Sequence, residues 1–352
     1  MPANTTYLTD QQLAQIAYKT FDYYINKGKR PHPQNIQNRP LLKLIGKKIA
    51  KTKRPFINNE VKYNVETVSD RQFQEKYGRE QIDFAEGYFG DTLTFNGTQV
   101  LLTLEVVHDA LRDMGYEVGS WQNWKVPPQV SEAAKLEIAE YLGHEFERLD
   151  DDYMRLMDSM LHGAGTGTPA FPGLAAFFPT TNTTGSIGGK SRAANVWVRH
   201  NATTGLTATA GGTLQTNLDN LVRECNRYAA SGAVDCYIVG SGVLDAVKTY
   251  AKNNNIQLNT NLAGVSGVDL SMPDSAIKWD GIPMIWDPTI DATNSKLGYA
   301  LNCGSLELAY ATDKEFGRPS DEYNLMVSRF VLRGRYAMVC KQPNANGVFT
   351  VA

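Results

Sequence analysis

The residues Gly188-Gly189-Lys190-Ser191 place two glycines, a cation and a hydroxyl in succession, which suggests a loop that binds nucleotide phosphates. Such a loop follows the pattern G-x-x-x-x-G-K-[ST], in which backbone N–H groups and the lysine surround the phosphates at the start of a helix. Position 184, where the first glycine belongs, is Thr184, and residues 195–199 (NVWVR) favour a strand over a helix. We therefore expect no nucleotide here, and the paired glycines need another explanation.

Other candidate catalytic or metal-binding groups are equally incomplete. No histidine completes a metal-ligand motif, although His144-Glu145 begins H-E-x-x-H. Successive residues of a helix point about 100° apart, so Asp150-Asp151-Asp152 cannot converge on one ion and is expected to form a solvated acidic face. Gly240-Ser241-Gly242 lacks the third glycine of a dinucleotide fingerprint and is interpreted as a helix-entry turn. The sequence thus predicts no catalytic residue, no cofactor and no metal.

Length and composition describe a globular chain. With 352 residues it is long enough for two domains with real cores, and its net charge is only −2. Its four cysteines are scattered and are expected to be packed thiols in a reducing compartment. We find no signal peptide and no apolar stretch of about 18 residues, so no membrane association is expected.

The charge is strongly segregated near the N-terminus. Between Lys27 and Arg54 lie ten Lys or Arg and no Asp or Glu, mixed with prolines. This composition predicts an extended arm that contacts either nucleic-acid phosphates or an acidic protein surface. The segment has no aromatic residue to stack on bases, and an acidic helix lies elsewhere in the chain, so we predict a strap to a neighbouring subunit. The residues assigned to this intersubunit arm are Lys43, Lys47, Lys48, Lys51, Lys53 and Arg54.

Periodicity predicts the elements that surround these residues. Helices are expected at 10–26, 131–162, 213–229 and 243–253, and strands at 60–69, 81–102, 234–239 and through much of 299–351. Asn96-Gly97 and Asp280-Gly281 are each expected to form a tight hairpin turn. The helix at 131–162 carries nine carboxylates against three basic residues. The order is an α+β chain with a thin β excursion at 58–102.

Two segments resemble the HK97-like major capsid proteins of tailed bacteriophages. One runs from Ile187 through Gly188, Gly189 and Arg192 to the stretch with Trp197 and Arg199, and the other is the hairpin 277–287 with Asp280 and Gly281, followed by Tyr299-Ala300-Leu301-Asn302. The resemblance implies that the paired glycines form a structural loop. It also implies an N-terminal arm (1–57), an extended β E-loop (58–102), a P domain with a long spine helix (103–170, returning at 305–352) and an α/β A domain (171–304).

That resemblance implies a non-enzymatic structural protein. It would self-assemble through hexamers and pentamers into the icosahedral shell of a virion, in the host cytoplasm, around double-stranded DNA contacted non-specifically. A separate scaffolding protein, a portal and possible decoration proteins would be its partners. Two alternatives stay open: an encapsulin-like nanocompartment that encloses a cargo enzyme, and a cytosolic α/β enzyme.

Overall fold

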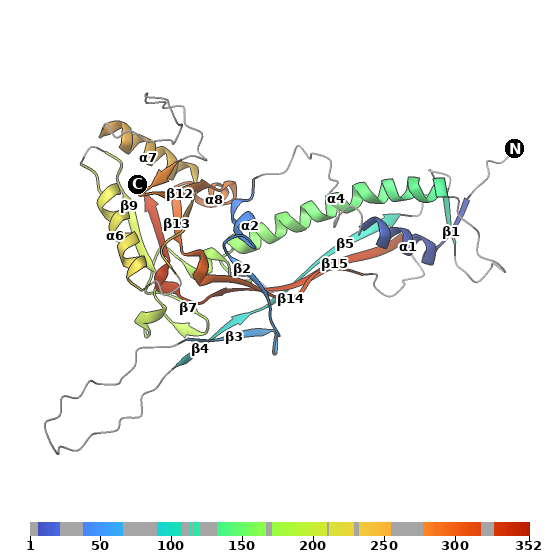
Figure 1. The fold of residues 1–352 in the computed structure, drawn as a ribbon, viewed down its shortest axis with the longest axis horizontal. Helices are drawn as coiled ribbons and strands as arrows, with labels where there is room; N and C mark the ends of the chain where they lie inside the picture. The colour runs from blue at the N-terminus through green and yellow to red at the C-terminus, as the bar shows by residue number, and fades with distance from the viewer. Residues whose placement is uncertain are drawn as a thin grey trace, which may run out of the picture. The chain divides into compact units, whose positions relative to one another are not determined.

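The computed structural model describes most of the chain (Figure 1). The chain divides into two compact units. Unit 1 comprises Met1–Gln37, Gln99–Asp158 and Tyr310–Tyr336, and unit 2 comprises Asn38–Thr98, Ser159–Ala309 and Ala337–Ala352. The described residues are 6–21, 38–65, 90–107, 113, 116–119, 132–166, 171–209, 211–228, 232–254, 277–317 and 327–352. Among the helices so described, none is long and apolar enough to cross a membrane.

Unit 2 is built on a mixed six-stranded sheet in the order β11-β12-β10-β13-β16-β9. The strands are β9 (Asn201–Leu206), β10 (Cys236–Val239), β11 (Lys278–Trp279), β12 (Ile282–Trp286), β13 (Leu297–Leu301) and β16 (Gly347–Val351). β10 lies between a parallel neighbour, β12, and an antiparallel one, β13. All four residues of β10 are buried, because both faces of this central strand are covered.

Side chains from alternate positions of the strands face different neighbours. Tyr237 and Val239 belong to a core cluster with helices α6 (Leu214–Arg227) and α7 (Ser241–Asn253), which lie beside the sheet in Figure 1. Tyr299, on β13, instead packs against Phe178, with ring centroids 6.4 Å apart. Each helix buries a stripe at helical spacing, such as Leu214, Leu218 and Leu221 on α6, so the predicted α/β unit is confirmed.

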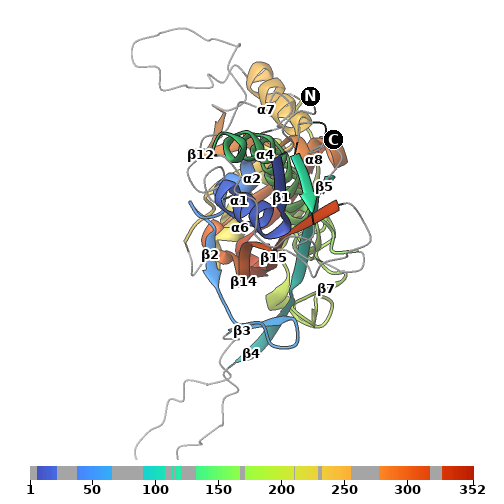
Figure 2. The ribbon, with the colours of Figure 1, turned by 90° about the vertical axis from the view of Figure 1, so that its right-hand side faces the viewer.

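Shorter elements of unit 2 surround this sheet. They are α2 (Pro40–Leu44), β2 (Ala50–Lys53), β3 (Glu60–Val65), β4 (Asp91–Asn96), α5 (Leu174–Phe177), β7 (Ser186–Ile187), β8 (Lys190–Ser191), the 3-10 turns η3 (Val196–Val198), η5 (Cys303–Ser305) and η6 (Pro343–Ala345), and α8 (Pro288–Asn294). β3 and β4 pair as antiparallel strands and lie side by side in both ribbon views (Figures 1 and 2). The predicted E-loop thus begins on a real β ribbon, while its expected tip at 71–80 lies outside the described residues.

Unit 1 holds most of the long helix and the larger parts of three long strands. Its elements are β1 (Thr6–Thr9), α1 (Asp10–Phe21), β6 (Tyr116–Gly119) and most of β5 (Thr98–Val107) and α4 (Glu132–His162). β14 (Leu306–Gly317) and β15 (Val327–Cys340) run from one unit into the other and belong to a four-stranded sheet ordered β2-β14-β15-β5. The predicted helix at 131–162 is confirmed, and α1 confirms the described part of the helix expected at 10–26.

Three expectations about local structure are wrong. Asn96-Gly97 is no hairpin turn, because β4 pairs with β3 whereas β5 belongs to the four-stranded sheet. The N–H of Gly97 instead donates to the carbonyl oxygen of Asn59 at 2.7 Å, at the point where the chain leaves one sheet and enters another. Residues 196–198 form a 3-10 turn, and the strand begins only at Asn201. In the described part of the basic segment, from residue 38 onward, β2 is the only extended strand, whereas Pro40–Leu44 form the helix α2 and the side chains of Leu41 and Ile49 are buried.

Candidate functional site

The paired glycines form the turn of a small antiparallel hairpin, β7–β8. Gly188 and Gly189 have φ angles of 55° and 80°, which is the positive pair that a type I′ turn requires and that glycine adopts without steric cost. The carbonyl oxygen of Gly188 accepts a hydrogen bond of 3.0 Å from the N–H of Thr94 on β4. A Cβ at position 188 would lie 2.7 Å from Cβ of Leu93. The glycines thus allow this turn to lie directly against the base of the predicted E-loop.

Lys190, the residue that most resembled a phosphate ligand, is paired with a carboxylate. Its Nζ lies 2.6 Å from Oδ1 of Asp91, at the start of β4. The hydrogen bond from Lys190 is the main reason that the pKa of Asp91 lies below its usual value, and the backbone N–H of Thr92 adds to it. The lysine therefore makes a second link between the glycine turn and β4, and the tertiary structure gives it a role that needs no nucleotide.

Arg192 holds the segment that follows, although the sequence did not single it out as a site residue. Its side chain is only 2 % exposed, and its guanidinium donates to the carbonyl oxygens of Ala176 at 3.0 Å, Phe177 at 2.8 Å and Thr184 at 3.2 Å. Burial lowers the pKa of this guanidinium. A buried cation surrounded by carbonyl oxygens satisfies backbone acceptors that would otherwise be costly to bury.

Arg199 continues this arrangement, as its position in the resemblance suggested. Its Nε donates to the carbonyl oxygen of Arg192 at 2.6 Å and its guanidinium to that of Ala193 at 2.8 Å. These bonds hold the backbone of 192–199 in a compact form, which explains the 3-10 turn that contains the half-buried Trp197. A strand here would break both bonds.

His200 is a buried structural residue. One ring nitrogen, Nε2, lies 2.6 Å from the carbonyl oxygen of Pro179, and the ring packs against Phe178. Burial, aided by the charge of Arg192, lowers the pKa of His200 to about 4. The ring is therefore neutral near pH 7 and donates its Nε2 proton to that carbonyl.

The Asp280-Gly281 turn is confirmed. The two residues have φ angles of 50° and 80° and join β11 to β12 in a type I′ hairpin. Next to the turn, Nε1 of Trp279 donates to Oδ1 of Asp219 on α6 at 3.0 Å. The hairpin at the edge of the sheet is thereby fastened to a helix of the same core.

A buried carboxylate fastens the end of the basic segment to the rest of unit 2. Glu307 is 1 % exposed and accepts from Arg54, with Nε to Oε1 at 2.6 Å, and from Nζ of Lys341 at 2.7 Å. Both cations also lie 5.6 Å from the ring centre of Tyr63 on β3. Burial by itself raises the pKa of Glu307, but the two cations outweigh it and hold the pKa below its ordinary value. Arg54 is therefore bound within its own chain.

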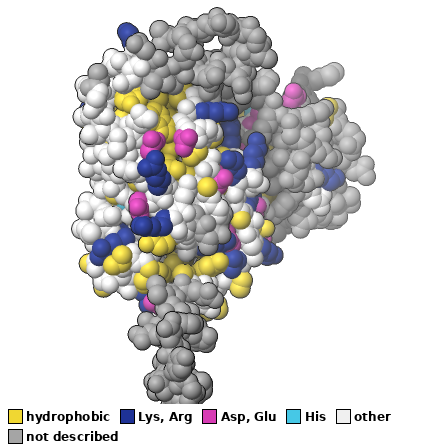
Figure 3. Space-filling model, turned by 60° about the vertical axis from the view of Figure 1, so that its left-hand side comes forward, with side chains coloured by type: hydrophobic (Ala, Val, Ile, Leu, Met, Phe, Trp, Pro, Cys, Tyr) yellow, Lys and Arg dark blue, Asp and Glu magenta, His cyan; other side chains and the backbone are white. Residues whose placement is uncertain are grey.

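The five lysines assigned to the arm lie on α2, the following turn and β2. Lys43, Lys47, Lys48, Lys51 and Lys53 are all exposed. On the face shown in Figure 3, Lys and Arg side chains are interspersed with Asp and Glu side chains. The sequence of 38–59, by contrast, contains no acidic residue. Their expected contact with a neighbouring subunit stays a prediction.

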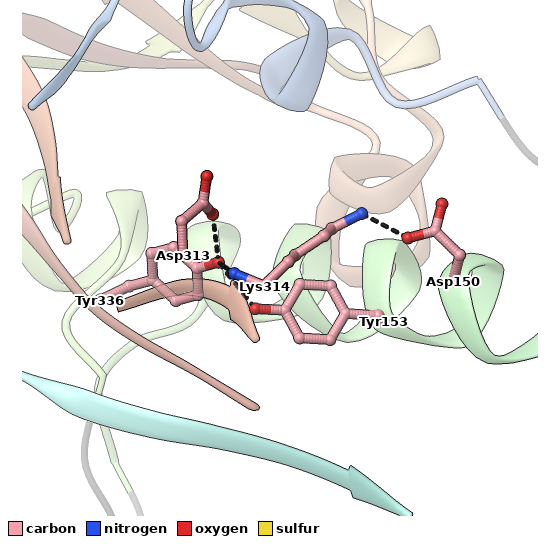
Figure 4. A network of polar contacts seen from close by, with 5 residues as sticks. All are labelled: Asp150, Tyr153, Asp313, Lys314 and Tyr336. Atoms are coloured by element: carbon pink, nitrogen blue, oxygen red, sulfur yellow. Dashed lines mark hydrogen bonds and ion pairs between the residues drawn. The ribbon is translucent and has the colours of Figure 1, made fainter. Parts of the chain in front are cut away.

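A network of polar side chains links α4 to β14 and β15 within unit 1 (Figure 4). The hydroxyl of Tyr153 donates to that of Tyr336 at 2.8 Å, and Tyr336 donates to Oδ1 of Asp313 at 2.6 Å. Nζ of Lys314 pairs with Asp150 and lies 5.2 Å from the ring centre of Tyr153. Burial raises the pKa of Tyr153 to about 12, so the phenol stays protonated as a donor.

The expected solvated acidic face of α4 is therefore only partly correct. Asp150 is 2 % exposed and faces Lys314, while Asp152 is exposed and pairs with Arg155 at 3.0 Å. Near its C-terminal end α4 buries Met157 and Leu161, whereas Leu156 is exposed. The burial of Asp150 is decided by the lysine and the strands that α4 meets.

The remaining acid–base pair of interest joins the end of α4 to α8. Nε2 of His162 lies 3.0 Å from Oδ2 of Asp287, and Oδ1 of Asp287 accepts from the N–H of Thr289, which caps α8. Both carboxylate oxygens thus hold helix ends in place. Within the residues that the structure describes, no group of three or more His, Cys, Asp or Glu could hold a metal ion.

Comparison with known proteins identifies the architecture. No family model matches the sequence, and no curated protein matches it. Among solved structures, the chain resembles the capsid subunit of cyanophage A-1(L), with a TM-score of 0.61 and 12% identity over 91% of this chain and 94% of that one. It also resembles the capsid of a native GTA particle, with a TM-score of 0.54 and 13% identity over 93% and 96% of the two chains. The chain has the HK97-like capsid fold.

One more structure with this HK97-like fold is the SrpI encapsulin of Synechococcus elongatus PCC 7942, with a TM-score of 0.50 and 13% identity over 91% of this chain and 89% of that one. The likeness confirms the predicted fold class. The division into arm, E-loop, P domain and A domain stays a prediction.

The structural residues that sequence reasoning missed are the buried ions Arg192, Glu307 and Asp150. Arg192 had one usable signal, since it ends the Gly-Gly segment on which the resemblance was based. Glu307 and Asp150 had none, because their partners Arg54 and Lys314 lie 253 and 164 residues away in the sequence.

Proposed function

We propose that this chain is a major capsid protein of a tailed bacteriophage, which self-assembles into the icosahedral shell around double-stranded DNA. One observation carries the proposal: the fold of a capsid subunit extends over 91% of this chain and 94% of the cyanophage chain. A match of that extent leaves little of either chain outside the shared fold. The proposed role is structural and requires no catalytic residue.

The proposed mechanism is repeated weak contact between copies of the chain in hexamers and pentamers. The segment 58–102 would reach neighbouring subunits as the E-loop, 1–57 would form the N-terminal arm, 103–170 and 305–352 would form the P domain, and 171–304 the A domain. The β3–β4 ribbon supports this role for the E-loop, because a two-stranded ribbon has little core of its own and gains stability by packing on another surface. Assembly in the host cytoplasm with a separate scaffolding protein and a portal, and possible decoration of the finished virion, complete the proposal.

Electron microscopy of the expressed full-length chain, alone and with a co-expressed scaffolding protein, tests this function. Closed shells of uniform size are expected under one of the two conditions. Small oligomers of fixed size under both conditions would instead favour a cytosolic enzyme.

An encapsulin-like compartment is the second candidate, because the SrpI encapsulin shares the fold. Particles purified from the native source distinguish the two shells. Nuclease-protected double-stranded DNA of uniform length is expected inside a capsid, whereas a co-purifying cargo enzyme without DNA would identify a nanocompartment.

A further inference from the structure

The five exposed lysines of 43–53 form a fixed surface, here called the basic ridge: Lys43, Lys47, Lys48, Lys51 and Lys53. The ridge is anchored on both sides of its turn. Leu41 and Ile49 are 0% and 1% exposed, and Arg54 pairs with the buried Glu307 just beyond β2. Anchors at three points fix the backbone from which the lysine side chains extend.

The turn between α2 and β2 is itself closed by backbone hydrogen bonds. The carbonyl oxygen of Leu44 accepts from the N–H groups of Lys47 at 3.1 Å and Lys48 at 2.8 Å, and the N–H of Gly46 donates to the carbonyl oxygen of Ile49 at 2.8 Å. Gly46 has a φ of 81°, the left-handed conformation that glycine adopts without strain. Lys47 and Lys48 therefore sit on a compact turn, although the composition had suggested an extended arm.

The hydrogen bonds that two ridge lysines make leave their charge in place. Nζ of Lys43 donates to the amide oxygen of Asn38 at 2.5 Å, and Nζ of Lys48 donates to the backbone carbonyl of Asp235 at 3.3 Å. Both acceptors are neutral. No Asp or Glu occurs between 38 and 59, so the segment that carries the ridge supplies no carboxylate of its own.

The proposed capsid function supplies a phosphate partner for the ridge, and the acidic surface of a neighbouring subunit is its competitor. The acidic helix α4 already pairs several of its carboxylates within the chain: Asp150 with Lys314, Asp152 with Arg155 at 3.0 Å and Glu145 with Arg148 at 3.4 Å. Of these pairs, only that of Asp150 with Lys314 lowers the acidic excess of the helix, from six to five, because Arg155 and Arg148 belong to α4 itself. On β2, Lys51 and Lys53 lie two residues apart on one face, about 6.6 Å along the strand, so they form a short row.

We propose that the basic ridge binds the phosphate backbone of double-stranded DNA without reading the bases. The inference deepens the proposed capsid function, on which it rests. Lysine suits this task because its ammonium is a point charge on a flexible stem and adapts to phosphates in any register. No aromatic residue lies between 38 and 54 to stack on bases, so binding is independent of sequence.

Fluorescence anisotropy with a labelled 20-base-pair duplex tests the proposal on purified, unassembled full-length protein between 50 and 200 mM salt. The test variant carries K43Q, K47Q, K48Q, K51Q and K53Q. A matched control removes five other exposed basic charges, with K62Q, R223Q, K252Q, K278Q and K296Q. Circular dichroism confirms that each variant is folded.

Each phosphate contact contributes about −0.9 to the slope of log K against log salt, so loss of five contacts is expected to make the slope shallower by about 3–5. The control is expected to shift it by less than about 1, and a duplex of unrelated sequence should behave identically. Equal slopes for the ridge and control variants overturn the proposal.

Two further measurements distinguish the competing partner and the shell function. If poly-glutamate of equal charge binds the ridge as tightly as the duplex does, the ridge recognises an acidic protein surface and the proposal is wrong. Electron microscopy of the ridge variant reports separately on assembly. Closed empty shells that have lost DNA affinity support the proposal, whereas wild-type DNA affinity with loss of shells favours the intersubunit strap and overturns it.

Discussion

Replacing each of the paired glycines by alanine tests whether the turn is shaped by close packing as well as by backbone conformation. Gly188 and Gly189 both have positive φ, so Gly188→Ala and Gly189→Ala each force a side chain into the left-handed region at a cost of about 1–2 kcal/mol. Only position 188 also lacks space. A Cβ added there would lie 2.7 Å from Cβ and 2.8 Å from Cδ2 of Leu93, whereas nothing lies within 4 Å at position 189.

The close approach adds about 1–3 kcal/mol of overpacking at position 188, so Gly188→Ala should lower the free energy of unfolding by about 2–5 kcal/mol in total. Gly189→Ala, the matched control, should lower it by about 1–2 kcal/mol. For a unit of roughly 230 residues, each kcal/mol corresponds to about 2 °C in melting temperature.

Urea unfolding of unassembled subunits, followed by circular dichroism, measures both losses. The slope of free energy against urea concentration should be unchanged, since neither variant alters the surface exposed on unfolding. If Gly188→Ala costs no more than Gly189→Ala, the glycine turn does not lie against Leu93 and the explanation of the paired glycines fails.

Three further predictions concern the other structural residues. Gly281→Val should lower the free energy of unfolding of the subunit by about 1–3 kcal/mol, because valine is strained at a φ of 80°. The control is Gly317→Val, at a position without positive φ and with nothing within 4 Å, which should change the free energy of unfolding by less than about 0.5 kcal/mol. Equal melting temperatures of the two variants would refute the type I′ turn. Glu307→Gln should cost about 1–3 kcal/mol at pH 7, since it leaves two partly buried cations without their counter-charge. Because the pKa of Glu307 is lowered, its ionised form stabilises the fold above its ordinary pKa of 4.5. The difference in the free energy of unfolding between wild type and Glu307→Gln should therefore shrink as the pH falls below that value. A difference that stayed constant down to a pH of about 2 would contradict the ion cluster. Tyr336→Phe should lower the free energy of unfolding by about 1–3 kcal/mol and Tyr153→Phe by about 1 kcal/mol, because Tyr336 both accepts from Tyr153 and donates to Asp313. Thermal unfolding of the two variants measures both losses, and the reverse order would exclude the network.

Elements with a strong local pattern could be predicted from the sequence. The long helix α4, the helices α6 and α7 and the Asp280-Gly281 turn all follow from spacing or from residue type over a few positions. The failures share a cause as well. Asn96-Gly97 has the composition of a hairpin turn, but its backbone is taken by Asn59 and its two strands enter different sheets.

The basic segment illustrates the same limit for charge. Composition identified ten positive charges without an acid, and from them we predicted an extended arm that straps a neighbouring subunit. It could not show that Leu41 and Ile49 are buried or that Arg54 is bound to Glu307. Those facts depend on a partner 253 residues away, which no local pattern contains.

By itself, the sequence determined the features that are encoded by residues close together in the chain. These are the periodic elements, the tight turn at Asp280-Gly281, the segregation of charge and the short motifs that resemble a capsid protein. Only the tertiary structure decided what the charged and glycine residues contact. Lys190 meets Asp91, Asp150 meets Lys314, and Gly188 lies against Leu93 because helices and strands far apart in sequence are brought together by burial of their apolar faces. An ion's partner is set by that non-local packing, which is why a lysine in a phosphate-like motif holds a β ribbon in place.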